Sequence, residues 1–266
     1  MSLHLFERMA VECEGEGDAV VCIHGLGGSS NTWTPLMGAL ARHRVVRIDL
    51  PGSGRSQRAE GPLSIARFVD AAARACERLG VASAHWLGHS MGSIVCQHLA
   101  VQWPRLVRSL ALFGPLAEPA PAARAGLRAR AERARVGGLE GMHEIALQLV
   151  QGSLSADTRE RQPLVTAYVR DGLMRGEAEA YARNCEALAD AQAARLEEVR
   201  APVLLVTGDE DAVAPPQAVR ALATRLTGAR SVRSVVLPRC GHWTPIERPA
   251  ECAREWRDFA AAASRA

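Results

Sequence analysis

Residues 85–103 have the sequence HWLGHSMGSIVCQHLAVQW. The apolar residues at 85–87 predict a buried strand, and 91–103 predict a helix that follows it directly. Ser90 stands between them, with Gly88 two positions before it and Gly92 two positions after it. A strand, a tight turn and a helix form the context in which a serine is exposed as a nucleophile. The stretch therefore predicts an α/β fold and a nucleophilic serine; an ordinary tight turn is the alternative.

The chain on either side of this stretch alternates short apolar runs with helical patterns. Helical spacing of apolar residues marks 64–79 and 217–226, and residues 9–14 alternate apolar and polar side chains as a half-exposed edge strand does. Five further runs are solidly apolar, as in strands buried on both faces. These runs lie at 20–24, 45–50, 107–113, 203–207 and 232–237. Buried strands that alternate with helices predict a doubly wound, mostly parallel sheet.

The alternation fails between about Leu116 and Leu196, where a proline-rich stretch leads into Ala- and Arg-rich helical patterns without strands. We expect a core formed by residues 1–115 and 197–266, with residues 116–196 inserted as a helical cap, or lid, over the carboxyl ends of the strands. Apolar cap positions such as Leu147 and Leu173 would then shape the substrate pocket. The alternative is a helical elaboration that only buttresses the core.

Composition limits the classes of function. The 266 residues suit one α/β domain with an insertion. The net charge is +3, no charge block stands out and aromatic residues are only 4%, which argues against a nucleic-acid partner. All 32 basic residues are arginine. The lack of lysine excludes Schiff-base aldolases, pyridoxal-phosphate enzymes, P-loop nucleotidases and protein kinases.

Cysteine usage and the chain's apolar runs bear on location. Seven cysteines occur without a CxxC pair, which favours buried free thiols in a reducing compartment over a disulfide framework or a zinc site. The first residues lack the apolar core of a signal peptide, and no stretch approaches the ~18 apolar residues of a membrane span. We therefore expect a cytoplasmic protein with no membrane association.

A nucleophilic serine requires a base, and the base requires an acid that orients it. His242 has the best setting for the base, because it lies in a loop between the apolar run 232–237 and the last helical pattern. His85 and His89 are four residues apart, as zinc ligands are on a helix, but they fall on a strand and its turn. We therefore expect no metal site.

The acid is expected at the carboxyl end of another strand, where active-site groups of open α/β sheets gather. Asp209 and Asp211 both follow the apolar run 203–207. With Asp211, the chain order is Ser90, Asp211, His242, which matches one known order of such triads. Asp209 is the local rival, and its alternative role is that of a turn residue that accepts hydrogen bonds from nearby backbone.

A glycine-rich segment, HGLGG at 24–28, follows the apolar run 20–24. Attack on an ester carbonyl creates an oxyanion that backbone N–H groups must hold, usually one after the nucleophile and one after such a strand. This nominates the amides of Met91 and Leu26. Trp33 and Trp243 flank the oxyanion segment and the base, so they are candidates for the substrate pocket, with core packing as the alternative.

Five motifs together make the chain resemble α/β-hydrolase-fold serine hydrolases along essentially its whole length. They are HGLGGSSNTW (24–33), DLPGSGRS (49–56), GHSMG (88–92), GDEDAVAPP (208–216) and CGHWTPIERP (240–249). The resemblance implies Ser90 as nucleophile, His242 as base and Asp211 as acid, because the family acid usually falls at the second Asp of GDxD. It also implies that 49–56 is structural and that no cofactor is needed.

The resemblance leaves several subfamilies open. Residues 179–188, EAYARNCEAL, are similar to the cap of 3-oxoadipate enol-lactonases, and small carboxylesterases and cofactor-free perhydrolases share the core motifs. The GHSMG elbow and the HGLGG loop favour a general esterase. We expect a serine esterase, monomeric or homodimeric, that cleaves a small carboxylic ester or lactone through an acyl-enzyme. The alternatives are an enol-lactonase, an acyltransferase or perhydrolase, and a ligand receptor without catalysis.

Overall fold

The computed structural model describes residues 1–56 and 60–263, so the last three residues of the expected core, 264–266, lie outside it. Eight strands form one sheet in the order β1-β2-β4-β3-β5-β6-β7-β8. They are β1 (Ser2–Phe6), β2 (Met9–Glu14), β3 (Ala19–Ile23), β4 (Arg44–Ile48), β5 (Ala84–His89), β6 (Val107–Phe113), β7 (Val203–Gly208) and β8 (Val232–Leu237). The pairs β1–β2 and β2–β4 are antiparallel, and the pairs from β4 to β8 are parallel. The predicted mostly parallel sheet is confirmed.

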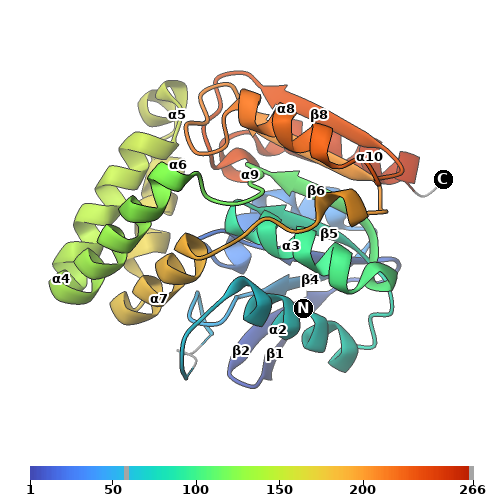
Figure 1. Cartoon of the computed structure of the whole chain (residues 1–266), viewed down its shortest axis with the longest axis horizontal. Helices are drawn as coiled ribbons and strands as arrows, with labels where there is room; N and C mark the ends of the chain where they lie inside the picture. The colour runs from blue at the N-terminus through green and yellow to red at the C-terminus, as the bar shows by residue number, and fades with distance from the viewer. Residues whose placement is uncertain (57–59, 264–266) are drawn as a thin grey trace.

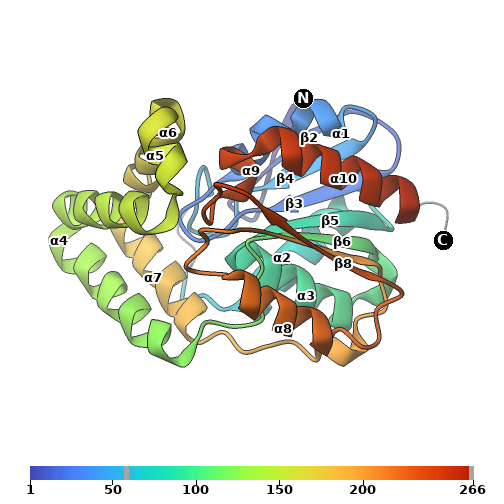
Figure 2. The ribbon, with the colours of Figure 1, turned by 90° about the horizontal axis from the view of Figure 1, so that it is seen from above.

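Helices cover both faces of this sheet. They are α1 (Met37–Leu40), α2 (Ile65–Arg78), α3 (Met91–Gln102), α8 (Pro216–Arg225), α9 (Thr244–Glu247) and α10 (Pro249–Ala263), with 3-10 turns η1 (Ser30–Leu36), η2 (Pro104–Leu106) and η3 (Leu196–Glu198). Figure 2 shows α2, α3 and α8 on one face and α1, α9 and α10 on the other. In the described part of the chain, no helix is both long and apolar enough to cross a membrane.

The solid apolar runs result from this two-sided cover. Successive side chains of a strand point to opposite faces. In β3, Val21 and Ile23 pack in the cluster beneath α2 and α3, whereas Val20 and Cys22 pack in the cluster beneath η1 and α10. Both sets of side chains must therefore be apolar, as the sequence predicted for strands covered by helices on both faces.

The two edges of the sheet differ from the sequence prediction. Residues 9–14 were expected as an edge strand, but β2 lies between β1 and β4 and is almost wholly buried. The edge is β1, a five-residue strand that the sequence pattern did not reveal. At the other edge, β8 is mostly exposed and not buried on both faces. An edge strand has one neighbour only, so its apolar valines cover less of the core than their sequence indicated.

Between β6 and β7 the chain forms four helices that lie together beside the sheet (Figure 1). We call them the cap helices: α4 (Pro121–Ser153), α5 (Ala156–Arg161), α6 (Pro163–Met174) and α7 (Ala178–Ala189). The long α4 bends sharply at Gly138, which has φ 53° and ψ −128°. Its two halves fold back on each other at this bend. The Arg133 guanidinium of the first half donates to Gln148 Oε1 of the second half at 3.0 Å. The apolar interior of the cap helices also includes Trp243, next to His242, and Ile246 of α9.

All seven cysteines are buried free thiols, as the sequence predicted. Four of them lie in or beneath the sheet: Cys13, Cys22, Cys76 and Cys96. Cys240 and Cys252 lie near the carboxyl end of the chain, and Cys185 lies on α7 within the cap helices. The thiols are therefore distributed over the core and the cap helices.

Candidate active site

Ser90 occupies the sharp turn between β5 and α3. Its backbone has φ 52° and ψ −119°, a conformation that favours glycine and costs a residue with a side chain about 1–3 kcal/mol. The Ser90 N–H donates to the carbonyl of Phe113 at 3.0 Å, which ties the turn to β6. A Cβ on Gly92 would lie 2.3 Å from the Ile23 carbonyl oxygen, so only glycine lets α3 start this close to β3.

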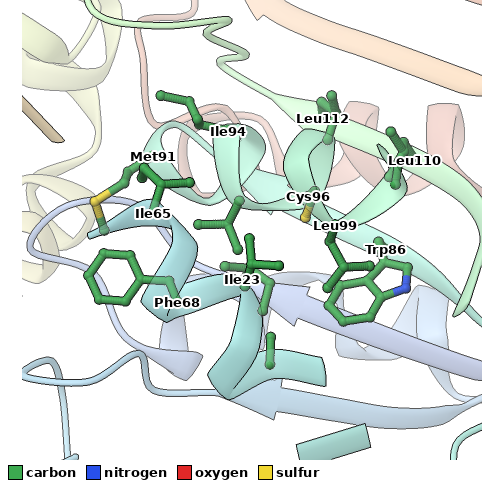
Figure 3. Close-up of a cluster of buried hydrophobic side chains, with 14 of the residues drawn as sticks. Ile23, Ile65, Phe68, Trp86, Met91, Ile94, Cys96, Leu99, Leu110 and Leu112 are labelled. Atoms are coloured by element: carbon green, nitrogen blue, oxygen red, sulfur yellow. The ribbon is translucent and has the colours of Figure 1, made fainter. Parts of the chain in front are cut away.

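Packing of the next residue holds the turn in place. The Met91 side chain is fully buried and lies beside Ile65 and Phe68 of α2 (Figure 3). A close-packed interior resists displacement of such a side chain. The core therefore holds the Met91 backbone, whose N–H follows directly after the candidate nucleophile.

The structure brings Ser90, His242 and Asp211 into one hydrogen-bonded chain. The Ser90 Oγ lies 2.8 Å from His242 Nε2. The His242 Nδ1 lies 2.9 Å from Asp211 Oδ2 and 3.1 Å from Oδ1. All three side chains are buried, although they come from three separate elements. This arrangement can move a proton from the serine hydroxyl to the imidazole and keep the imidazole in one orientation.

The surroundings of Asp211 favour its charged form. Burial alone raises the pKa of this carboxyl group, but the His242 imidazole and the backbone N–H groups of Ala214 and Val213 oppose it, and together they hold the pKa below its ordinary value. Those N–H groups donate to Asp211 Oδ1 at 2.7 and 2.8 Å, and the Thr207 hydroxyl donates to Oδ2 at 3.2 Å. The carboxylate therefore stays available to accept a hydrogen bond from the His242 Nδ1–H group.

The rival acid has a different partner. Asp209 is exposed, and its Oδ1 accepts the backbone N–H of Cys240 at 3.1 Å. It joins the loop after β7 to the loop before His242, which is the turn role that the sequence left open. Of the two carboxylates, the structure brings Asp211 to the histidine.

The backbone amides of Leu26 and Met91 both lie at the edge of the same site. Among the described residues, neither N–H has a hydrogen-bond acceptor. His24 fixes the loop of Leu26: its Nε2 accepts the Leu50 N–H at 3.0 Å, and its Nδ1 donates to the Gly25 carbonyl at 2.7 Å. Burial lowers the pKa of His24 and keeps the ring neutral, as an acceptor nitrogen requires. Two unpaired amides, one on a fixed loop and one at the start of α3, can hold a developing oxyanion.

A cavity of about 350 Å³ opens onto Ser90 and His242. Most of its lining is apolar, and it comes from both the core and the cap helices. The lining includes Leu26, Leu116, Leu127, Leu149, Leu188 and Trp243. This size suits a small molecule.

Three sequence expectations about the pocket need correction. Trp33 does not line the cavity; it is fully buried in the core and meets Phe113 edge-on at 5.7 Å between ring centroids. Leu147 is 46% exposed and points away from the cavity lining. Leu173 is buried against the glycine loop at Gly27 and does not line the cavity near Ser90. Trp243 does line the cavity, with its indole N–H donating to Ser153 Oγ at 3.0 Å.

Sequence reasoning missed Glu247 altogether. This buried carboxylate accepts the N–H groups of Gly241 and Trp243, on either side of His242, at 3.1 and 3.0 Å. It also accepts the N–H of Ser155, next to the end of α4, at 2.9 Å. Glu247 thereby fixes the loop of the candidate base to the cap helices. Nothing in the sequence indicated that Glu247 is buried, because a glutamate close to the start of a helix is usually exposed.

Two more neighbours of the candidate base were also missed. The His89 Nε2 donates to the His242 carbonyl at 2.9 Å, and the centroid of the His89 ring lies 5.1 Å from that of His242 and 5.3 Å from that of Trp243. Burial lowers the pKa of His89 to about 3, and the nearby His242 makes a smaller contribution in the same direction. A Cβ on Gly114 would lie 2.9 Å from the His242 ring. His89 ends β5 and Gly114 follows β6, and a position at the carboxyl end of a strand was the signal that could have identified them.

Comparisons with known proteins bear on the fold and on the class of reaction. A family model for the alpha/beta hydrolase fold matches residues 18–249. The chain is 28% identical over 209 residues, 78% of its length and 76% of the relative's, to the (E)-2-((N-methylformamido)methylene)succinate hydrolase of Acinetobacter baylyi. A thermophilic esterase from Thermogutta terrifontis, solved with malate bound, has a TM-score of 0.88 and 27% identity over 96% of this chain and 93% of that chain. The enol-lactonase from Burkholderia xenovorans LB400 has a TM-score of 0.87 and 29% identity over 98% and 100%.

Proposed function

The chain belongs to the α/β-hydrolase family and is a hydrolase, and from this premise we propose that it is a serine esterase for small carboxylic esters or lactones. The observation that carries the proposal is the 2.8 Å separation between Ser90 Oγ and His242 Nε2 at the wall of the cavity. The Asp211 contact on the far side of the same imidazole supports it.

In the proposed reaction, Ser90 Oγ attacks the carbonyl carbon of the substrate while His242 Nε2 takes the hydroxyl proton. The tetrahedral intermediate collapses, the bond to the alcohol oxygen breaks, and His242 returns the proton to the leaving alcohol. Water then attacks the acyl-enzyme, again with His242 as base, and releases the acid and the free serine. Asp211 accepts a hydrogen bond from the Nδ1–H group throughout and stabilises the charged imidazole.

We assign the oxyanion to the N–H groups of Leu26 and Met91. Their lack of an acceptor among the described residues supports this assignment. A donor of this kind acts where charge develops and costs no reorganisation during the reaction, and each is worth about 2.7–4 kcal/mol in comparable enzymes. A substantial part of the rate enhancement is therefore expected from backbone that the core holds in place.

The cap helices act in this proposal as a lid that shapes the pocket. Leu127 and Leu149 of α4 line the cavity together with Ser90, which supports a role in substrate selection over a purely buttressing one. A lid excludes water from the reacting groups and sets the size of the acyl chain that fits. The free thiols support the further proposal that the protein works in a reducing compartment such as the cytoplasm.

A fluorophosphonate probe and a series of p-nitrophenyl esters of increasing chain length test the proposal. We expect the probe to label Ser90, and we expect the Ser90→Ala variant to lose both labelling and ester hydrolysis while it keeps its circular dichroism spectrum. Near-native turnover by the folded variant would refute the serine mechanism. Product analysis with added alcohols or peroxide distinguishes hydrolysis from acyl transfer and perhydrolysis.

A further inference from the structure

One face of the first half of α4 forms a wall of the cavity. Ala123, Gly126, Leu127 and Arg130 all line it, and their spacing of three, one and three residues puts them on the same side of a helix. The first three are small or apolar. Arg130, which is partly buried, lines the same cavity as Ser90 and His242.

The charge of Arg130 is not balanced by an acid. No Asp or Glu is among the described residues that line the cavity, and within the described chain Arg130 forms no ion pair. The acids of the neighbouring α7 are already bound to other arginines. Glu179 and Glu186 pair with Arg135 at 2.8 and 3.0 Å, and Asp190 pairs with Arg128 at 2.7 Å.

Two ionisable groups of α7, the Tyr181 hydroxyl and the Cys185 thiol, interact with Arg130. Both are uncharged at neutral pH. Burial raises the pKa of Cys185 to about 12 and raises that of Tyr181 well above its ordinary value, and the guanidinium only partly opposes this effect. Neither group supplies the negative charge that a partly buried guanidinium favours.

We propose that Arg130 makes this cavity selective for esters that carry a free carboxylate, which the guanidinium binds while Ser90 attacks the ester carbonyl. This inference rests on the serine esterase function proposed above. The planar guanidinium donates two parallel hydrogen bonds to a carboxylate, and such charge-assisted pairs are stronger than neutral ones.

The composition of the cavity favours a carboxylate over a phosphate. A phosphate monoester is close to doubly charged at neutral pH. Arg130 is the one arginine among the described residues that line the cavity, and its single charge balances a single carboxylate. The remaining lining is mostly apolar and the volume is about 350 Å³, which fits the half ester of a short dicarboxylic acid.

The test compares monomethyl adipate with methyl hexanoate, a neutral ester of the same acyl chain length, at pH 7.5, where the free carboxyl group is ionised. We expect the wild type to prefer the half ester in kcat/KM. Arg130→Gln should lower the ratio of half ester to neutral ester by about tenfold to a hundredfold, the range for a hydrogen bond to a charged group. Arg130→Lys should fall between, because it keeps the charge and loses the planar fork.

Arg128→Gln is the matched control. Arg128 lies two residues away on the same helix, pairs with Asp190 and does not line the cavity. We expect it to leave the ratio unchanged. Equal losses in the two glutamine variants, or a wild type without preference for the half ester, would overturn the inference while neutral ester hydrolysis and probe labelling of Ser90 still supported the esterase.

A binding measurement separates the two proposals if no ester is turned over. Calorimetric titration of monomethyl adipate into Ser90→Ala, with Arg130 intact or replaced by Gln, reports the carboxylate contact without any catalysis. Binding that requires Arg130 would support the anion site even if the serine mechanism failed. Binding that is the same with and without Arg130, or no binding to either protein, would overturn the inference.

Discussion

Asp209 and Asp211 stand two residues apart in one loop, yet their carboxylates have different partners. Asp211 is buried against His242, whereas Asp209 is exposed and accepts the Cys240 N–H. The Asp211 contact affects the protonation of the imidazole, whereas the Asp209 contact holds the backbone of the loop. A substitution of Asp211 should therefore affect catalysis, and one of Asp209 should affect the structure of the loop.

We predict that Asp211→Asn lowers kcat for ester hydrolysis by about 10⁴-fold, the loss found for the equivalent change in another triad enzyme, because the amide holds the wrong tautomer of His242. Asp209→Asn keeps a side-chain acceptor for the Cys240 N–H and should cost less than about tenfold. Steady-state kinetics of both purified variants check this. Similar small losses in the two would place the acid elsewhere in the chain.

The sequence could name the residues of the candidate triad because their types and order carry the chemistry. It could not identify Glu247 or Gly114, because their importance comes from backbone that folds around them from distant segments. Trp33 shows the reverse error: it flanks the oxyanion segment in sequence, but its side chain turns into the core. Proximity along the chain does not determine where a side chain points.

At the scale of elements, the loop of His242 is fixed to the cap helices at more than one point. Glu247 binds Ser155 together with the residues on either side of His242, and the His242 N–H donates to the Ser153 carbonyl at 2.7 Å. Displacement of the carboxyl end of α4 would therefore disturb the candidate base. If the cap helices act as the proposed lid, these contacts would let them influence catalysis as well as substrate size.

We predict that Glu247→Gln lowers the free energy of unfolding by about 1–3 kcal/mol, because the amide places an N–H against one of the backbone donors that the carboxylate accepts. Urea denaturation measures the effect. Glu251→Gln, in the first turn of α10, is the control and should change stability by less than about 0.5 kcal/mol. Equal effects of the two changes would mean that Glu247 has no special role in the loop.

The proposed role of the cap helices in substrate size is best tested on α4. Leu149 lines the cavity, whereas Leu147 on the same helix is exposed. We predict that Leu149→Ala enlarges the pocket and shifts the preference in the p-nitrophenyl series toward longer acyl chains, while Leu147→Ala leaves the profile unchanged. Probe labelling of Ser90 should persist in both variants. An unchanged profile in Leu149→Ala would mean that the cap helices do not set chain length.

The sequence predicted most elements because the sheet is covered on both faces and its strands are solidly apolar. It failed at the edges, where β1 is too short and mixed in composition to stand out and β8 is apolar but exposed. It also placed helices between 116 and 196 but not the fold of α4, whose two halves pack through contacts such as Arg133 with Gln148. Local periodicity carries no information about such pairings.

For the whole molecule, buried neutral histidines determine how stability responds to acid. Burial lowers the pKa of His24, lowers that of His85 to about 4 and lowers that of His89 to about 3. The unfolded chain binds protons on these rings near pH 6.5, before the folded protein does. The free energy of unfolding therefore falls as pH decreases below about 6.5. Asp211 also lowers the free energy of unfolding in acid, but only when the pH falls below the ordinary pKa of an aspartate, because the folded state depresses the pKa of this carboxyl group.

We predict that the free energy of unfolding falls between pH 6 and pH 5 by about 1.4 kcal/mol per pH unit for each such histidine. Urea denaturation across this range measures the slope. His89→Gln should reduce the slope by about one proton, whereas His143→Gln, at an exposed position, should not change it. A stability that is flat over this interval would contradict the burial of neutral rings.

The seven buried thiols are native probes of local unfolding, so no cysteine has to be introduced. A thiol reagent reaches a buried cysteine only when the surrounding structure opens, so the rate at which each one is alkylated reports the local opening equilibrium. Alkylation of Cys185 reports on the cap helices, that of Cys22 on the centre of the sheet and that of Cys96 on α3. Mass spectrometry of one alkylation series would therefore show whether the cap helices unfold separately or only when the entire molecule unfolds.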